Sequence, residues 1–140
     1  MRRVLALDIG SVRIGVAVTD PLGLFAQGIA VWQVQDDWRE KLEECLRQYD
    51  PEPVLIGMPR RTDGSYGPEA QKIQKLVEEL QEAYPHRQFE TWDERYTTVI
   101  AQRALLEADV SRGKRKQKVD KIAAALILQS WLETQGSHPR

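Results

Sequence analysis

The sequence predicts an α/β fold in which a mixed five-stranded sheet is flanked by helices. The spacing of its apolar residues predicts, in chain order, three strands, a helix, a strand, a helix, a strand and further helices. The first three strands form a meander, and the later strand–helix–strand units call for parallel crossovers. With 140 residues, 41% of them hydrophobic, and a net charge of −1, we expect one globular domain over residues 1–140.

Three strands are predicted in the first 33 residues. Val4–Ile9 is largely apolar, and Arg13–Thr19 follows as its hairpin partner after the turn at Gly10–Val12. Leu24–Gln33 is the third strand, because turn-forming proline and glycine residues precede it. These strands form the meander.

The next segment alternates between helices and a buried strand. Asp36 or Asp37 can cap a helix. Val54–Met58 is wholly apolar, as expected of a central strand that is covered on both faces. A second helix follows the loop Pro59–Pro68 and ends before Pro85. The first helix has an apolar stripe formed by Trp38, Leu42, Cys45, Leu46 and Tyr49.

The last third of the chain contains the fifth strand and further helices. Gln88–Asp93 is predicted as the strand, and Thr98–Ala108 as a helix. Asp109–Lys118 is predicted as a basic loop, and Val119–Glu133 as the last helix. Five of the seven residues at 112–118 are basic.

Composition excludes several classes of protein. The longest apolar run, Ile122–Leu128, is too short to cross a bilayer, which needs about 20 residues. The basic and apolar start is interrupted at Asp8, before it reaches the length of a signal peptide. The single cysteine, Cys45, is expected in the core and cannot form an internal disulfide. We therefore expect a cytoplasmic monomer or weak homodimer with no membrane partner.

Three carboxylates are candidate site residues. Asp8 ends an apolar strand, so it is either a turn former before Gly10 or a paired, hydrogen-bonded or metal-bound carboxylate. Glu94 lies at the carboxyl end of the fifth strand, on the edge where ligand sites collect in α/β sheets, unless it is a plain surface charge. Asp120 interrupts the apolar stripe of the last helix in its first turn, where a capping role is the alternative.

If these three acids meet, they form an oxygen-rich site. Such a site favours Mg²⁺ or Mn²⁺ over Zn²⁺, and the chain has no paired histidines or clustered cysteines. Two such ions about 4 Å apart would activate a water and stabilise the leaving oxygen of a phosphodiester. Asp93, next to Glu94, is expected on the opposite face of the strand.

Basic and hydroxyl side chains flank the three acids. The basic run at residues 112–118 leads directly into Asp120 and suits a polyanionic substrate such as nucleic acid, although it could be only a solvated loop. Arg61 follows the fourth strand at the same edge. The candidate substrate-binding residues are Arg13, Arg60, Arg95, Thr97, Lys114, Arg115, Lys116 and Lys118.

Four motifs, in this order, span nearly the whole chain. They are Leu7–Ala17, Ile56–Pro59 with Asp63 and Gly64, Asp93–Thr98, and Val119–Gln129. Together they resemble the motifs of the YqgF family of Holliday-junction-resolvase-like nucleases, with Met58 where leucine is usual. The resemblance implies a ribonuclease H-like fold and a metal-dependent nuclease, with Asp8, Glu94 and Asp120 as its acidic residues.

The resemblance also implies a cellular role, which is processing of the 5′ end of the 16S ribosomal RNA precursor. Similarity to RuvC-type resolvases implies cleavage of branched DNA instead. The spacing and charge of the residues in this sequence do not distinguish between the two substrates. A catalytically silent nucleic-acid-binding factor is a second alternative. The segment Asp8–Gly10 also resembles the first phosphate loop of actin-like ATPases, but 140 residues leave no room for their second lobe.

Overall fold

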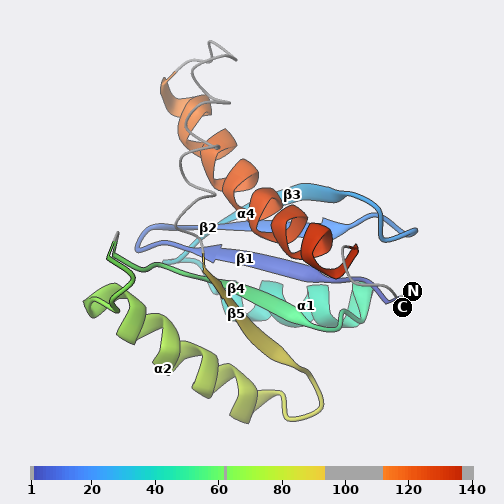
Figure 1. The fold of residues 1–140 in the computed structure, drawn as a ribbon, viewed down its shortest axis with the longest axis horizontal. Coiled ribbons are helices and arrows are strands. Elements are labelled where there is room, and N and C mark those ends of the chain that lie inside the picture. The colour runs from blue at the N-terminus through green and yellow to red at the C-terminus, as the bar shows by residue number, and fades with distance from the viewer. Residues whose placement is uncertain (1, 62, 94–111, 137–140) are drawn as a thin grey trace.

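The computed structural model describes residues 2–61, 63–93 and 112–136 (Figure 1). They form five strands and three helices. The strands are β1 (Leu5–Ile9), β2 (Arg13–Thr19), β3 (Ala26–Gln33), β4 (Val54–Met58) and β5 (Phe89–Asp93). The helices are α1 (Trp38–Tyr49), α2 (Pro68–Ala83) and α4 (Arg112–Gly136).

The strands form one mixed sheet in the order β3-β2-β1-β4-β5. β2 pairs antiparallel with both β1 and β3, which confirms the predicted meander. β1 pairs parallel with β4, and β4 pairs parallel with β5. The predicted ribonuclease H-like architecture is therefore confirmed, and the carboxyl ends of β1, β4 and β5 lie at the same edge of the sheet.

Each face of the sheet is covered by its own helices (Figure 1). Leu5 and Leu7 of β1 belong to the core that packs under α1 and α2. Ala6 of β1 and Leu55 of β4 belong to the core under α4. Because β4 is fully buried on both faces, its sequence carries no polar residue.

The third strand begins at Ala26, two residues later than predicted. The Asp20 carboxylate accepts hydrogen bonds from the amides of Leu24 and Phe25, at 2.7 and 2.8 Å, and so closes a turn before β3. These hydrogen bonds, that from Phe25 first, hold the pKa of Asp20 below its usual value. The turn leaves Leu22, Leu24 and Phe25 exposed.

The prediction of a basic loop up to Lys118 was wrong. α4 begins at Arg112, so the basic run at residues 112–118 is helical. Arginine, lysine and glutamine are good helix formers. The run was predicted as a loop because of its many charges, although its helix propensity is high. The predicted helix Thr98–Ala108 lies outside the described residues. None of the described helices combines the length and apolar composition that a bilayer crossing requires.

The single cysteine lies where its helical position predicted. Cys45 is half-buried on α1 and packs against the core formed with Leu42 and Leu46. Burial raises the pKa of the Cys45 thiol, with a smaller contribution from the nearby Glu44 carboxylate. The thiol is therefore held in its protonated, less nucleophilic form.

Leu55→Ala tests the importance of the core under α4. Leu55 is fully buried, so its truncation is expected to lower the free energy of unfolding by about 2–5 kcal/mol. Leu22→Ala is the matched control, because Leu22 is 71% exposed and its truncation should cost less than about 0.5 kcal/mol. Urea denaturation followed by circular dichroism measures both. Equal losses in the two variants would contradict this account of the core.

Candidate active site

Asp8 lies at the carboxyl end of β1, directly before a tight turn. It pairs with Gly15 of β2 and is half-buried. The amide of Gly10 donates a hydrogen bond of 2.9 Å to the carbonyl oxygen of Arg13. A Cβ on Gly10 would lie 2.9 Å from the same oxygen, so only glycine fits there. The turn returns the chain to Arg13 at the start of β2, as the glycine after Asp8 predicted.

Asp8 lines an open cavity of about 590 Å³ at the edge where β1 and β4 end. The first turns of α2 form the opposite wall. The lining residues include Gly10, Ser11, Pro59, Glu69, Lys72 and Ile73. A carboxylate and an ammonium group therefore border the same solvent-filled space. Such a space can admit a charged ligand.

Arg60, on the loop between β4 and α2, holds that loop to the end of β5. Its Nε donates a hydrogen bond of 2.9 Å to the carbonyl oxygen of Gly64. Its Nη1 lies 3.3 Å from a carboxylate oxygen of Asp93. Its guanidinium also lies over the ring of Tyr66, 4.6 Å from the centroid. These contacts show that Arg60 organises the loop, and its predicted role in substrate binding stays a prediction.

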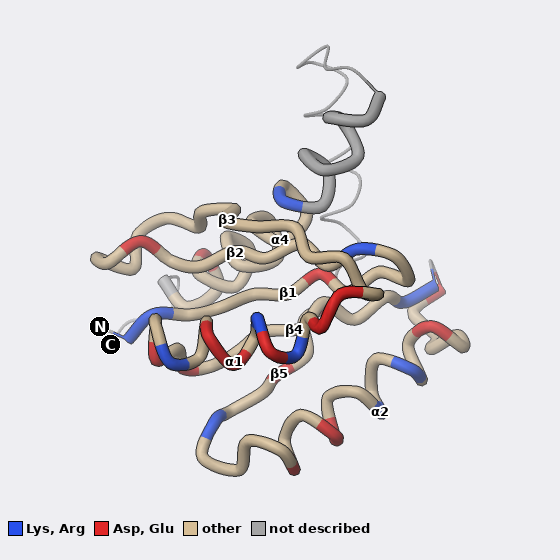
Figure 2. Tube along the Cα trace, turned by 180° about the vertical axis from the view of Figure 1, so that it is seen from behind, with Lys and Arg blue, Asp and Glu red and all other residues tan. Residues whose placement is uncertain are grey.

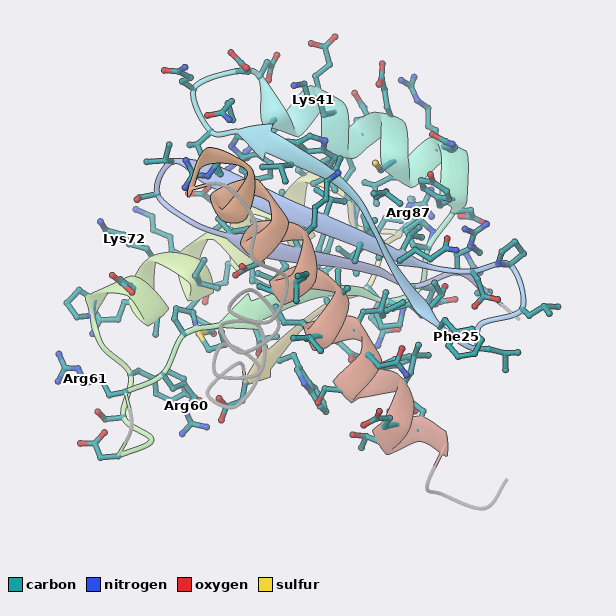
Figure 3. All side chains as sticks on the ribbon, turned by 90° about the horizontal axis from the view of Figure 1, so that it is seen from above. Phe25, Lys41, Arg60, Arg61, Lys72 and Arg87 are labelled. Carbon is teal, nitrogen blue, oxygen red and sulfur yellow. The ribbon has the colours of Figure 1, made fainter. Side chains whose placement is uncertain are left out.

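A second cavity, of about 500 Å³, adjoins the first. The two share Pro59, Glu69 and Lys72. Arg60 and Arg61 line the second cavity, and Figure 3 shows both arginines on the same side of the molecule as Lys72. In Figure 2 the basic segments of this loop and of α2 lie toward the end of the sheet where β1 finishes.

Lys72 was missed by the sequence analysis, and so was Glu69. Both residues occupy exposed positions on α2, where charged residues are common and carry no functional signal. Their position early in a helix that starts at the ligand-binding edge could have identified them. The sequence places the start of this helix after the loop Pro59–Pro68, but its first turn was not considered as part of the site.

The described residues contain only part of the predicted site. Asp8 is described, whereas Glu94 lies outside the described residues and so does the side chain of Asp120. Within the described ranges, no cluster of three histidine, cysteine or acidic residues could hold a metal ion. That Asp8, Glu94 and Asp120 lie close together therefore stays a prediction.

The same holds for most of the predicted cationic and hydroxyl residues. Arg13 and Arg60 are described, at the start of β2 and after β4. Arg95 and Thr97 lie outside the described residues. The remaining four belong to α4, but their side chains lie outside the described part; they are Lys114, Arg115, Lys116 and Lys118.

α4 reaches the sheet directly after Asp120. A Cβ on Gly28 of β3 would lie 3.1 Å from both the Cβ and the carbonyl oxygen of Lys121. This close approach favours glycine at position 28, because a larger residue would have to push Lys121 away by a few tenths of an ångström. Ala124 and Ile127, farther along α4, are fully buried against the sheet. The helix therefore passes from its basic first turns onto the sheet near residue 121.

Comparison with known proteins identifies relatives that match nearly the whole chain. The family model of RuvX, described as a Holliday junction resolvase, matches residues 2–134. A protein of Clostridium perfringens (strain SM101 / Type A) is 46% identical over 134 residues, covering 94% of this chain and 96% of the relative. A Listeria monocytogenes serovar 1/2a protein is 42% identical over 136 residues, covering 94% and 98%. Both are provisionally named as pre-16S rRNA nucleases.

Solved structures share the fold at low sequence identity. The fowlpox virus resolvase in complex with Holliday junction DNA has a TM-score of 0.57 at 11% identity, covering 95% of this chain and 98% of that chain. The fowlpox virus Holliday junction resolvase in a second crystal structure has a TM-score of 0.53 at 17% identity, covering 94% and 99%. At this identity the likeness concerns the fold.

Arg60→Ala tests whether this side chain organises the loop after β4. Removing the guanidinium deletes its bonds to Gly64 and Asp93, so the amide of Gly64 should exchange its hydrogen at least about tenfold faster. Arg61→Ala is the matched control, because Arg61 is exposed and makes neither of these side-chain bonds. Hydrogen exchange followed by NMR measures both variants. Unchanged exchange in Arg60→Ala would show that the loop holds its shape without Arg60.

Proposed function

Since this chain belongs to the RuvX (YqgF) family, we propose that it is a divalent-metal-dependent nuclease that hydrolyses phosphodiester bonds of nucleic acid. The observation that carries the proposal is the position of Asp8, half-buried at the carboxyl end of β1 and lining an open cavity. The names of the relatives favour the 16S ribosomal RNA precursor as substrate, with processing at its 5′ end. Branched DNA is the alternative, because the family model and the fowlpox structure are both described as resolvases.

The donor chemistry of the site fits Mg²⁺ or Mn²⁺. Asp8 provides carboxylate oxygens, which are the ligands that these ions prefer. Glu94 and Asp120 would complete the set. Two features support their approach to Asp8: β5 ends in register with β4, and the main chain just after Asp120 packs on the sheet. When bound, the ions would acidify a water molecule and neutralise charge on the phosphate.

The described side chains also account for attraction of a polyanion. Lys72 lies on the wall of the cavity that Asp8 lines, and Arg61 borders the adjoining cavity. Both can neutralise backbone phosphates without reading sequence. Arg13, at the start of β2 beside the Asp8 turn, is a further candidate for phosphate contact. The basic run at residues 112–118 belongs to the start of α4, so it remains a candidate for further phosphate contacts.

Asp8→Asn tests the catalytic proposal. Asparagine has the same size but lacks the negative charge that holds a cation, so cleavage should fall by more than about a hundredfold. The assay supplies Mn²⁺ and compares an RNA that contains the 5′ precursor segment of 16S rRNA with a four-way DNA junction. Asp36→Asn is the matched control, since Asp36 lies in the exposed turn before α1.

Full activity in Asp8→Asn would overturn the proposed role of this carboxylate. If the natural sequence binds nucleic acid in EDTA but cleaves neither substrate with any divalent ion, the chain is a silent nucleic-acid-binding factor. Preference for the junction over the RNA would favour the resolvase alternative. The melting temperatures of Asp8→Asn and the natural sequence are compared by circular dichroism. Equal values would show that a loss of cleavage does not come from a loss of folding.

A triple substitution of Lys114, Arg115 and Lys116 by glutamine tests the contribution of α4 to binding. Glutamine keeps the helix propensity while removing three positive charges. Affinity for nucleic acid should fall, and the slope of log K against log salt should decrease by up to about 3. Fluorescence anisotropy in EDTA at several salt concentrations measures both. Unchanged affinity and slope would mean that this part of α4 does not contact the nucleic acid.

A further inference from the structure

Tyr66 is an exposed aromatic side chain that directly precedes Gly67, a residue that lines the second cavity. It lies on the loop between β4 and α2, and 57% of its surface is exposed. An aromatic ring that is open to water gains little from the core. Phe25 is exposed to a similar degree, at 65%, but lies on the turn before β3, and Figure 3 shows it on the side of the molecule away from Arg60 and Arg61.

The ring of Tyr66 is oriented by a side chain that is itself fixed. The Arg60 guanidinium covers the ring at 4.6 Å from its centroid, within the range of a cation–π contact. Arg60 is held in turn by the carbonyl oxygen of Gly64 and the carboxylate of Asp93. The ring therefore packs on a guanidinium group that is itself held in place, and much of its surface is still exposed.

Hydrogen bonds within the loop fix the backbone before Tyr66. The Arg61 amide donates to the carbonyl oxygen of Ser65 at 3.0 Å, and the Gly64 amide donates to that of Arg61 at 2.8 Å. The Asp63 carboxylate accepts a hydrogen bond of 2.9 Å from the Ser65 amide. A ring that is positioned before its ligand arrives loses little conformational entropy on binding.

Positive charge connects Tyr66 with Asp8. Arg60, whose guanidinium lies over the ring of Tyr66, lines the second cavity together with Arg61. That cavity shares Lys72 with the first cavity, which Asp8 lines. A nucleic-acid strand lying at Asp8 can therefore follow cationic side chains to the ring of Tyr66. Phosphates would contact Lys72 and Arg61, and a base would reach the ring.

We propose that Tyr66 is a stacking site for an unpaired base of the nucleic-acid strand that occupies the Asp8 cavity. This inference rests on the proposed function for the identity of the strand. Stacking on an aromatic ring needs the flat face of a base, which is hidden in a continuous duplex and accessible in a single strand. The site therefore selects a substrate with unpaired nucleotides beside the cleaved bond. Every base has such a face, so the selection is for strandedness rather than for sequence.

The test compares binding of Tyr66→Ala and Tyr66→Phe to a single-stranded oligoribonucleotide and to a blunt RNA duplex of the same sequence. Stacking on one ring is worth about fivefold to a hundredfold in affinity. Tyr66→Ala should lose that amount for the single strand only, and Tyr66→Phe should bind as the natural sequence does. Phe25→Ala is the matched control and should bind both probes normally. Fluorescence anisotropy of the full chain in EDTA measures the affinities without cleavage.

The inference is overturned if Tyr66→Ala binds the single strand as tightly as the natural sequence, or if it loses affinity for strand and duplex equally. Quenching of 2-aminopurine in the single strand provides a second readout, because stacking on Tyr66 should quench it and Tyr66→Ala should relieve the quenching. Cleavage by the natural sequence with normal binding by Tyr66→Ala refutes the stacking site alone. Selective loss of single-strand binding without any cleavage supports the stacking site and refutes the nuclease.

Discussion

Two parallel pairings, of β1 with β4 and of β4 with β5, bring the carboxyl ends of three strands to one edge of the sheet. Asp8 ends the first of these strands, and the loop with Arg60 follows the second. Asp93 ends the third and pairs with Arg60. Residues from positions 8, 60 and 93 of the chain thus share one region. Antiparallel pairing of β1 with β4 would send the β4 loop to the opposite edge.

The cores on the two faces keep this edge in place. Because α1 and α2 cover one face and α4 covers the other, the central strands are buried and cannot slip in register without exposing apolar side chains. The start of α2 then borders the cavity at Asp8, and α4 comes onto the sheet beside Gly28. The site is therefore formed by elements whose positions are set by apolar packing rather than by the polar residues themselves.

Arg60 has a structural role that its position in the sequence does not indicate. A cation after a central strand, at the ligand-binding edge, is a natural candidate for contact with phosphate. In the structure its donors are used by Gly64 and Asp93, and its flat face supports Tyr66. The charge is partly neutralised by Asp93, so Arg61 and Lys72 are better candidates for direct contact with a polyanion.

The sequence by itself determined the five strands, their order along the chain and the position of Asp8 at a strand end, because apolar periodicity and turn residues are local properties. It also identified the family, since four motifs occur in a fixed order. Only the tertiary structure decided that Lys72 borders the Asp8 cavity, that Arg60 supports Tyr66, and that the basic run of α4 is helical. The first two depend on contacts between elements far apart in sequence. The third depends on a balance between helix propensity and charge that a pattern of residues does not resolve.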